Sequence, residues 1–88
     1  LFVNFGETEE NYILSIVSQL RQTGISVEFY PNADKFNKQM AYAMANRIPY
    51  LVKIEEADRL ANQARIKNLI SGEQFTVTVE DLSKWQNF

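Results

Sequence analysis

The 88-residue sequence contains no cysteine and no histidine. The absence of cysteine excludes disulfide bonds and thiol nucleophiles, and the absence of histidine excludes imidazole bases. Together the two absences remove the usual ligands of protein zinc sites. No apolar run approaches the roughly 20 residues of a membrane span, and no signal segment opens the chain. We therefore expect a soluble, cytoplasmic protein with no membrane partner.

The length of the chain allows one domain. Because 45% of its residues are hydrophobic, the chain can close a single core, as expected for a small domain. The chain begins at Leu1 rather than at Met, and its first residues already have the pattern of a strand. We therefore interpret residues 1–88 as one domain cut from a longer protein, whose missing part would hold the catalytic chemistry.

Charge is distributed unevenly along the chain. The formal net charge of −2 argues against a domain that binds nucleic acid through its overall electrostatics. The segment 35–67 nevertheless carries a local charge of +4, while the remainder carries −6. The charged residues of this segment are Lys35, Lys38, Arg47, Lys53, Arg59, Arg65 and Lys67 against Glu55, Glu56 and Asp58. The alternative is ordinary scatter of charge over solvated faces.

The first 30 residues predict a strand, a helix and a second strand. Residues 1–5 form a short apolar run, and residues 25–30 alternate between apolar and polar. Between them, apolar residues recur at helical spacing, namely Ile13, Ile16, Val17 and Leu20. Acidic residues suit the first turn of this helix, and Gly24 suits a left-handed residue after its end. We expect the helix to run from about Glu7 to Thr23.

A second helix and a central strand follow. Asp34 is the expected N-cap, and Pro49 prevents the helix from continuing. The expected buried stripe consists of Phe36, Met40, Ala43 and Met44. Residues 50–54 form a nearly unbroken apolar run, which is typical of a central strand covered on both faces.

The last third of the sequence predicts a helical turn, two strands and a final helix. The helical turn falls within residues 55–62, and the strands cover residues 64–69 and 75–79 with a tight turn at residues 71–73. The final helix opens at Glu80 and should bury Leu82 and Trp85. Helical crossovers make the first three strands parallel, and the tight turn makes the last two antiparallel. The sequence therefore predicts an α/β fold with a mixed five-stranded sheet.

Two candidate sites for catalysis or nucleotide binding are disfavoured. The turn after the first strand is where a doubly wound fold holds a phosphate, but the acidic residues from Glu7 to Glu10 would repel it. Glu55, Glu56 and Asp58 could bind Mg²⁺ or transfer protons, yet no histidine or other convergent group accompanies them. We expect no catalytic residue, no metal site and no cofactor site in this domain.

Side chains suited to single-stranded RNA occur at two places. Asn32, Lys35, Lys38 and Gln39 surround the start of the second helix, whose free amides favour anions. Arg65 and Lys67 share one face of a strand, and Ala64 and Ile66 share the other. Single-stranded RNA is bound by amide and charged side chains and by stacking on aromatic or guanidinium planes. Surface lysines that are merely solvated are the alternative.

Four segments of the sequence resemble a known family. Residues 35–43, 47–52 and 65–74 resemble the C-terminal anticodon-binding domain shared by the histidyl, threonyl, prolyl and glycyl tRNA synthetases. Residues 20–28 resemble the family's "LR..GI.VE" segment. The lysine-lysine-glutamine spacing and the Ser71–Gln74 turn look most like the histidyl enzymes. The chain departs from the family at Glu55, where a glycine is common, and at Met44 and Arg47, where aspartate or glycine is common.

The resemblance implies a three-layer α/β/α fold with strand order 2-1-3-4-5 and an antiparallel fourth strand. It implies that the domain holds the anticodon loop of a tRNA, while a separate catalytic domain of a homodimeric parent enzyme uses ATP and Mg²⁺. The expected anticodon-binding residues, including Arg65 from the strand pattern, are Asn32, Lys35, Lys38, Gln39, Asp58, Arg65 and Lys67. A stand-alone regulatory or protein-interaction domain of the same fold is the alternative, and a flavodoxin-like nucleotide binder is disfavoured by the first turn.

Overall fold

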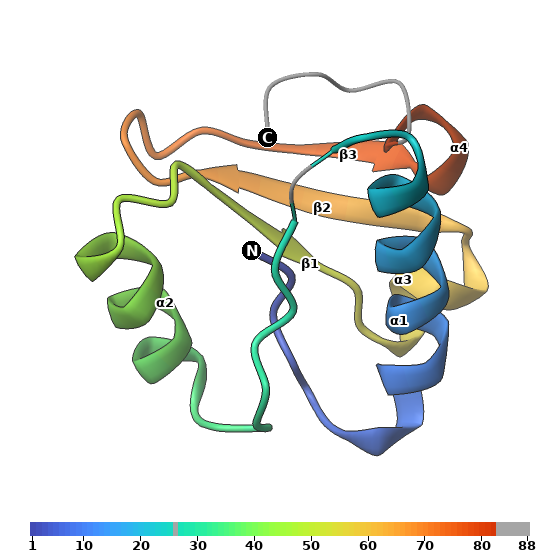
Figure 1. Cartoon of the computed structure of the whole chain (residues 1–88), viewed down its shortest axis with the longest axis horizontal. Coiled ribbons are helices and arrows are strands. Elements are labelled where there is room, and N and C mark those ends of the chain that lie inside the picture. The colour runs from blue at the N-terminus through green and yellow to red at the C-terminus, as the bar shows by residue number, and fades with distance from the viewer. Residues whose placement is uncertain (26, 83–88) are drawn as a thin grey trace.

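A three-stranded antiparallel sheet forms the centre of the computed structural model, which describes residues 1–25 and 27–82 (Figure 1). Its strands are β1 (Tyr50–Lys53), β2 (Gln63–Asn68) and β3 (Gln74–Thr78), in the order β1-β2-β3. The register places Lys53 opposite Arg65 and Ile66 opposite Phe75. The antiparallel placement of the predicted fourth strand, here β2, is therefore confirmed.

The two N-terminal extended segments join this sheet through single bridges. Phe2 forms parallel bridges with Phe29 on one side and with Val52 of β1 on the other. The segments thus lie in the predicted order, but five regular strands are not found among the described residues. One reason is local: past Val3, the backbone N–H and C=O of Asn4 bond to the Gln39 side chain rather than to a neighbouring strand.

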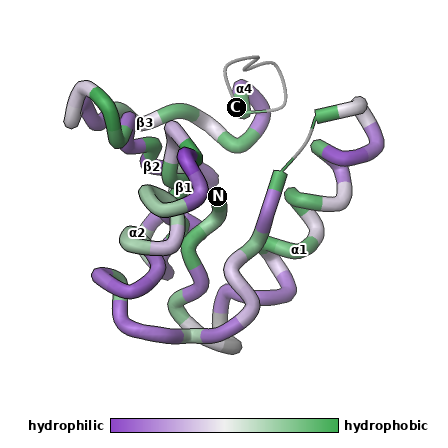
Figure 2. Tube along the Cα trace, turned by 60° about the vertical axis from the view of Figure 1, so that its left-hand side comes forward, coloured by the Kyte–Doolittle hydropathy of each residue, from purple (hydrophilic) through white to green (hydrophobic). Residues whose placement is uncertain are grey.

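Helices cover both faces of the sheet, and Figures 1 and 2 show α1 and α2 on opposite sides of the strands. One face packs against α1 (Glu7–Gln22), α3 (Glu56–Leu60) and α4 (Val79–Leu82). The other packs against α2 (Phe36–Ala45). Neighbouring residues of β1 divide between two cores, because Val52 packs with the α1 side and Leu51 with the α2 side. The α/β class and the burial of the central strand on both faces are confirmed.

Helix α1 agrees with the sequence prediction to within one residue. It ends at Gln22, and Gly24 takes the left-handed conformation with a φ of 88°. Thr23 Oγ1 donates a hydrogen bond to the Leu20 carbonyl at 2.7 Å, and the Ile25 amide donates to the same carbonyl at 3.1 Å. These bonds satisfy one of the carbonyl groups that a helix end leaves free.

Helix α2 differs from the prediction at both ends. Its N-cap is Lys35 rather than Asp34, whose carboxylate instead lies 3.5 Å from Lys38 Nζ. Met44, expected in the buried stripe, is 62% exposed, because the helix buries Gln39 and Ala43 and turns Met44 to the edge of that face. The helix ends at Ala45, before Pro49, and Arg47 between them has a left-handed φ of 56°.

The remaining elements follow the predicted order. Leu82 is fully buried as expected, while the prediction for Trp85 lies outside the described residues. No helix within residues 1–25 and 27–82 is both long and apolar enough to cross a membrane.

Candidate nucleic-acid interface

Three basic side chains share the α2 face of the sheet. Lys53 lies opposite Arg65, and Leu51 lies opposite Lys67, in the antiparallel pairing of β1 and β2. Residues directly opposite in such a pair project to the same face. Ala64 and Ile66 alternate with these residues and are fully buried on the other face. The prediction that Arg65 and Lys67 share one face of their strand is therefore confirmed.

A hollow of about 200 Å³ lies where this face meets the start of α2. It is lined by Phe5, Phe36, Lys53, Glu55 and Arg65, and we call it the aromatic hollow. The Lys53 ammonium lies 5.2 Å from the centre of the Phe36 ring, within the range of a cation–π contact. Burial lowers the pKa of Lys53, and the charges of Arg65 and Lys67 lower it further. The hollow thus places aromatic side chains and the Lys53 ammonium beside the Arg65 guanidinium, whose charge is offset by Glu55 and Asp58.

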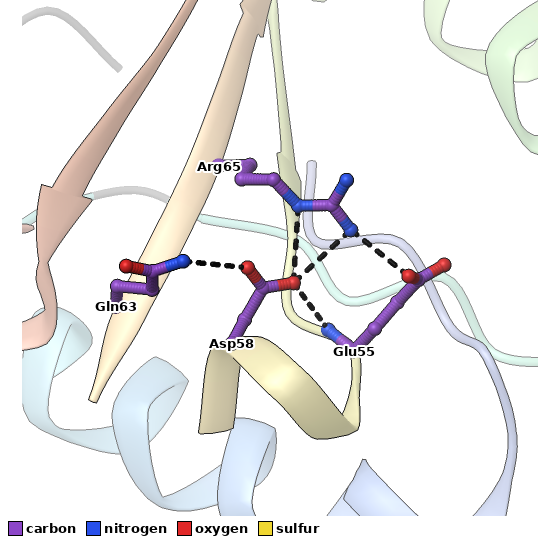
Figure 3. A network of polar contacts seen from close by, with 4 residues as sticks. All are labelled: Glu55, Asp58, Gln63 and Arg65. Atoms are coloured by element: carbon purple, nitrogen blue, oxygen red, sulfur yellow. Dashed lines mark hydrogen bonds and ion pairs between the residues drawn. The ribbon is translucent and has the colours of Figure 1, made fainter. Parts of the chain in front are cut away.

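Arg65 is held in place by two carboxylates (Figure 3). Asp58 Oδ2 accepts a hydrogen bond from Arg65 Nε at 3.0 Å, and Arg65 Nη2 forms ion pairs with Asp58 Oδ2 and Glu55 Oε2, both at 3.0 Å. Asp58 further accepts from the Glu55 amide at 2.9 Å and from Gln63 Nε2 at 3.2 Å. A guanidinium bonded in this way has one orientation relative to the hollow.

Asp58 is itself 3% exposed, so its carboxylate faces the protein rather than solvent. Burial alone raises the pKa of a carboxyl, but the hydrogen bonds from Glu55 and Gln63 and the charge of Arg65 outweigh it and hold the pKa of Asp58 below its usual value. The Glu55 and Asp58 side chains also form the capping box of α3. The structure therefore places Asp58 behind Arg65, with its oxygens already bonded.

A second hollow, of about 250 Å³, lies on the other side of the first strand-to-helix corner. We call it the loop hollow, and it is lined by Asn4, Gly6, Glu10, Pro31, Asn32 and Ala33. Asn4 lines the loop hollow and its neighbour Phe5 lines the aromatic hollow, as successive residues of an extended segment project to opposite sides. The negative charge of Glu10 makes the loop hollow a poor site for phosphate. The amide and carbonyl groups of its other lining residues suit a neutral ligand.

The seven predicted site residues fall into two groups. Asn32, Lys35, Lys38, Arg65 and Lys67 have side-chain surface open to solvent. Gln39 and Asp58 are buried, and their polar atoms are bonded within the protein. Only Arg65 of the seven lines the aromatic hollow, and only Asn32 lines the loop hollow.

The sequence interpretation missed four residues of the aromatic hollow, namely Phe5, Phe36, Lys53 and Glu55. Lys53 could have been singled out from the sequence, because it is the one charged residue in the apolar run from Tyr50 to Ile54. The two phenylalanines were not, because an aromatic residue beside a core is usually part of it.

No cluster of three or more acidic side chains within residues 1–25 and 27–82 is arranged to hold a metal ion. Asp58, one of the three acidic residues considered for that purpose, is committed to Arg65.

An α/β domain with basic side chains and an aromatic hollow at one end of its sheet has the features of a small RNA-binding module. Residues 1–86 match the family described as "Anticodon binding domain", and the chain belongs to that family. The family assignment made by resemblance is thus confirmed, and of the implied fold the α/β class is confirmed.

Two relatives with similar sequences are histidine–tRNA ligases. The chain is 43% identical over 74 residues to the enzyme of Porphyromonas gingivalis, covering 84% of this chain and 16% of the relative. It is 43% identical over 82 residues to the enzyme of Bacteroides fragilis, covering 93% of this chain and 18% of the relative. The chain therefore spans less than a fifth of the length of these relatives.

Solved structures of tRNA synthetases are also similar to this chain. The crystal structure of histidyl-tRNA synthetase from Nostoc sp. PCC 7120 superposes with a TM-score of 0.88 at 30% identity, over 94% of this chain and 20% of that one. The RNA-binding domain of threonyl-tRNA synthetase from Cryptosporidium parvum Iowa II superposes with a TM-score of 0.84 at 18% identity, over 94% of this chain and 21% of that one. The second likeness concerns the fold alone.

Proposed function

We propose that this chain holds the anticodon loop of a histidine tRNA at the end of the sheet where the aromatic and loop hollows lie. The observation that carries the proposal is the aromatic hollow, in which two phenylalanine rings stand beside the Lys53 ammonium and the oriented Arg65 guanidinium. Unstacked bases bind to aromatic and guanidinium planes, and nearby cations attract the phosphates.

The accessible predicted residues have distinct roles in this proposal. Lys35 and Lys38 lie at the start of α2 and contact the RNA backbone, where the helix dipole adds to their charge. Asn32 offers an amide to a base edge in the loop hollow. Lys67, further along the sheet face from Arg65, contacts a base of the anticodon.

The wider protein is part of the same proposal. Residues 1–88 are one domain of a longer synthetase, and the relatives' greater length supports this. A separate catalytic domain joins histidine to the tRNA with ATP and Mg²⁺, so this domain needs no catalytic residue or cofactor of its own. We place the parent enzyme in the cytoplasm as a homodimer.

A pair of matched substitutions tests the role of the aromatic hollow. Phe5 in the hollow is 38% exposed, and Phe75 on the opposite face of the sheet is 36% exposed. Stacking on an aromatic ring contributes about 1–3 kcal/mol per base. Phe5→Leu should therefore weaken binding of a histidine anticodon stem-loop by at least about fivefold, while Phe75→Leu leaves it unchanged. Equal effects of the two substitutions would remove the aromatic hollow from the RNA site.

A further inference from the structure

Gln39 is a polar side chain with no exposed surface beside the proposed RNA site. Its Oε1 accepts a hydrogen bond from the Asn4 amide at 2.7 Å, and its Nε2 donates to the Asn4 carbonyl at 2.7 Å. One side-chain amide thus bonds both backbone groups of Asn4, as a neighbouring strand would. Nε2 also donates to the Asp34 carbonyl at 2.8 Å. Gln39 therefore ties α2 to the N-terminal segment and to the loop that precedes α2.

The Asn4 side chain completes the connection. Its Nδ2 donates to the Tyr30 carbonyl at 3.0 Å, and its Oδ1 accepts from the Gly6 amide at 3.0 Å. The loop of residues 31–33 is thus anchored at both ends, at Tyr30 by Asn4 and at Asp34 by Gln39. This loop forms one wall of the loop hollow.

Both hollows depend on these bonds. The corner formed by Asn4 and Phe5 separates the two hollows, and the position of that corner is set by the bonds between Asn4 and Gln39. A loop that is already fixed loses less conformational entropy when a ligand binds. Because Gln39 is buried and its polar atoms are bonded inside the protein, it has no polar atom available to RNA.

We propose that Gln39 is a positioning residue, which fixes the loop of residues 31–33 and the Asn4–Phe5 corner so that both hollows stay open to RNA bases. It does not itself contact RNA. This inference rests on the proposed function, because the hollows are those assigned to the anticodon loop. It replaces the expectation that Gln39 reads the anticodon directly.

Two isosteric substitutions on α2 separate this role from a charge effect. Gln39→Glu keeps the shape of the side chain but turns the Nε2 donor into an oxygen facing the Asn4 and Asp34 carbonyls. Asn37→Asp adds the same charge on the same helix at an exposed position. Loss of a group that orients the ligands of a metal site costs about tenfold or more in affinity, and we expect a similar loss here. In the 88-residue chain, Gln39→Glu should weaken stem-loop binding by about tenfold more than Asn37→Asp.

Hydrogen exchange tests the positioning role without RNA. In Gln39→Glu the amides of residues 32–35 should exchange faster, while those of β2 and β3 keep their protection, because the broken bonds hold only the loop and the corner. If Gln39→Glu fails to fold, Gln39→Met, which removes the bonds without adding charge, takes its place. Unchanged exchange in the loop would overturn the inference.

A double substitution distinguishes positioning from a general loss of stability. If Gln39 acts through the loop, Asn32→Ala costs less RNA affinity in the Gln39→Glu background than in the wild type, whereas independent effects add. Lowering the pH should partly restore binding by Gln39→Glu relative to the wild type, because the introduced carboxyl regains a donor when protonated. Additive losses would overturn the inference. A wild-type chain that binds no stem-loop, with loop exchange still faster in Gln39→Glu, would overturn the proposed function and leave the positioning role standing.

Discussion

Asp58 holds the Arg65 guanidinium from behind, accepting a hydrogen bond from its Nε and forming an ion pair with its Nη2, both at 3.0 Å, while remaining almost fully buried. Arg65, in contrast, is about one-third exposed and lines the aromatic hollow. The carboxylate thus determines where the guanidinium points, and the guanidinium faces the aromatic hollow. In the proposed function, Asp58 therefore acts through Arg65 rather than by touching RNA.

Substitution of Asp58 should lower stability and change its pH dependence. Asp58→Asn should reduce the free energy of unfolding by about 1–3 kcal/mol, because a buried hydrogen-bonded charge is lost. The pKa of Asp58 is lowered in the folded protein from an ordinary value of 3.8. Its contribution to stability is therefore present above pH 4 and is lost as the pH falls through the folded pKa. Urea unfolding of wild type and variant across the acid range measures both effects.

Exposed Glu56, on the same helix, supplies the control. Glu56→Gln should leave the stability within about 0.5 kcal/mol of wild type. If the acid limb of the stability curve is as steep in Asp58→Asn as in the wild type, Asp58 is not the group that titrates.

Lys67 should affect recognition without affecting stability. Its side chain on β2 is half-buried and still open to solvent, and its replacement by alanine should change stability by only about 0.5 kcal/mol. A lost base contact costs on the order of 1–3 kcal/mol of discrimination. Lys67→Ala should therefore keep its Tm and lose part of its preference for the histidine anticodon over a base-substituted one. Equal losses for both stem-loops would make Lys67 a phosphate contact, and no loss would exclude it from the site.

Binding should depend on salt through the lysines at the start of α2. Each neutralised phosphate contributes about −0.7 to the slope of log affinity against log salt for single-stranded nucleic acid. Lys35→Ala should therefore make the slope shallower by about 0.7. Affinities at four or five salt concentrations give both slopes, and an unchanged slope would place Lys35 away from the phosphates.

Replacement by glycine of Arg47, the left-handed residue after α2, should stabilise the protein. Arg47 has a φ of 56° and an exposed side chain, and a non-glycine residue pays a conformational cost there. Arg47→Gly should raise the free energy of unfolding by about 0.5–1 kcal/mol relative to Arg47→Ala, which keeps the same strain. Denaturant unfolding of the two variants decides this, and a more stable alanine variant would contradict it.

Much of the fold could be predicted because it depends on local patterns. The helical spacing from Ile13 to Leu20 and the apolar run from Tyr50 to Ile54 each specify an element from neighbouring residues alone. The full five-stranded sheet could not, because the N-terminal segment leaves the sheet at Asn4, where its partner is a side chain 35 residues away.

The candidate site was predictable by residue type but not by role. A glutamine in a basic segment and an aspartate after a strand both suit RNA contact, and nothing nearby in the sequence marks Gln39 or Asp58 as buried. Their burial follows from Asn4 and Arg65, which only the fold brings close. The aromatic hollow likewise joins Phe5 to Phe36 across two elements.

The proposed function requires this chain to distinguish the histidine anticodon from those of related synthetases. The most direct measurement is the affinity of the 88-residue chain for four stem-loops with one common stem and the anticodons for histidine, threonine, proline and glycine. Since a good base contact contributes on the order of 1–3 kcal/mol, the histidine stem-loop should bind at least about fivefold more tightly than each of the others. Equal affinity for all four stem-loops, or a preference for one of the other three, would contradict the claim.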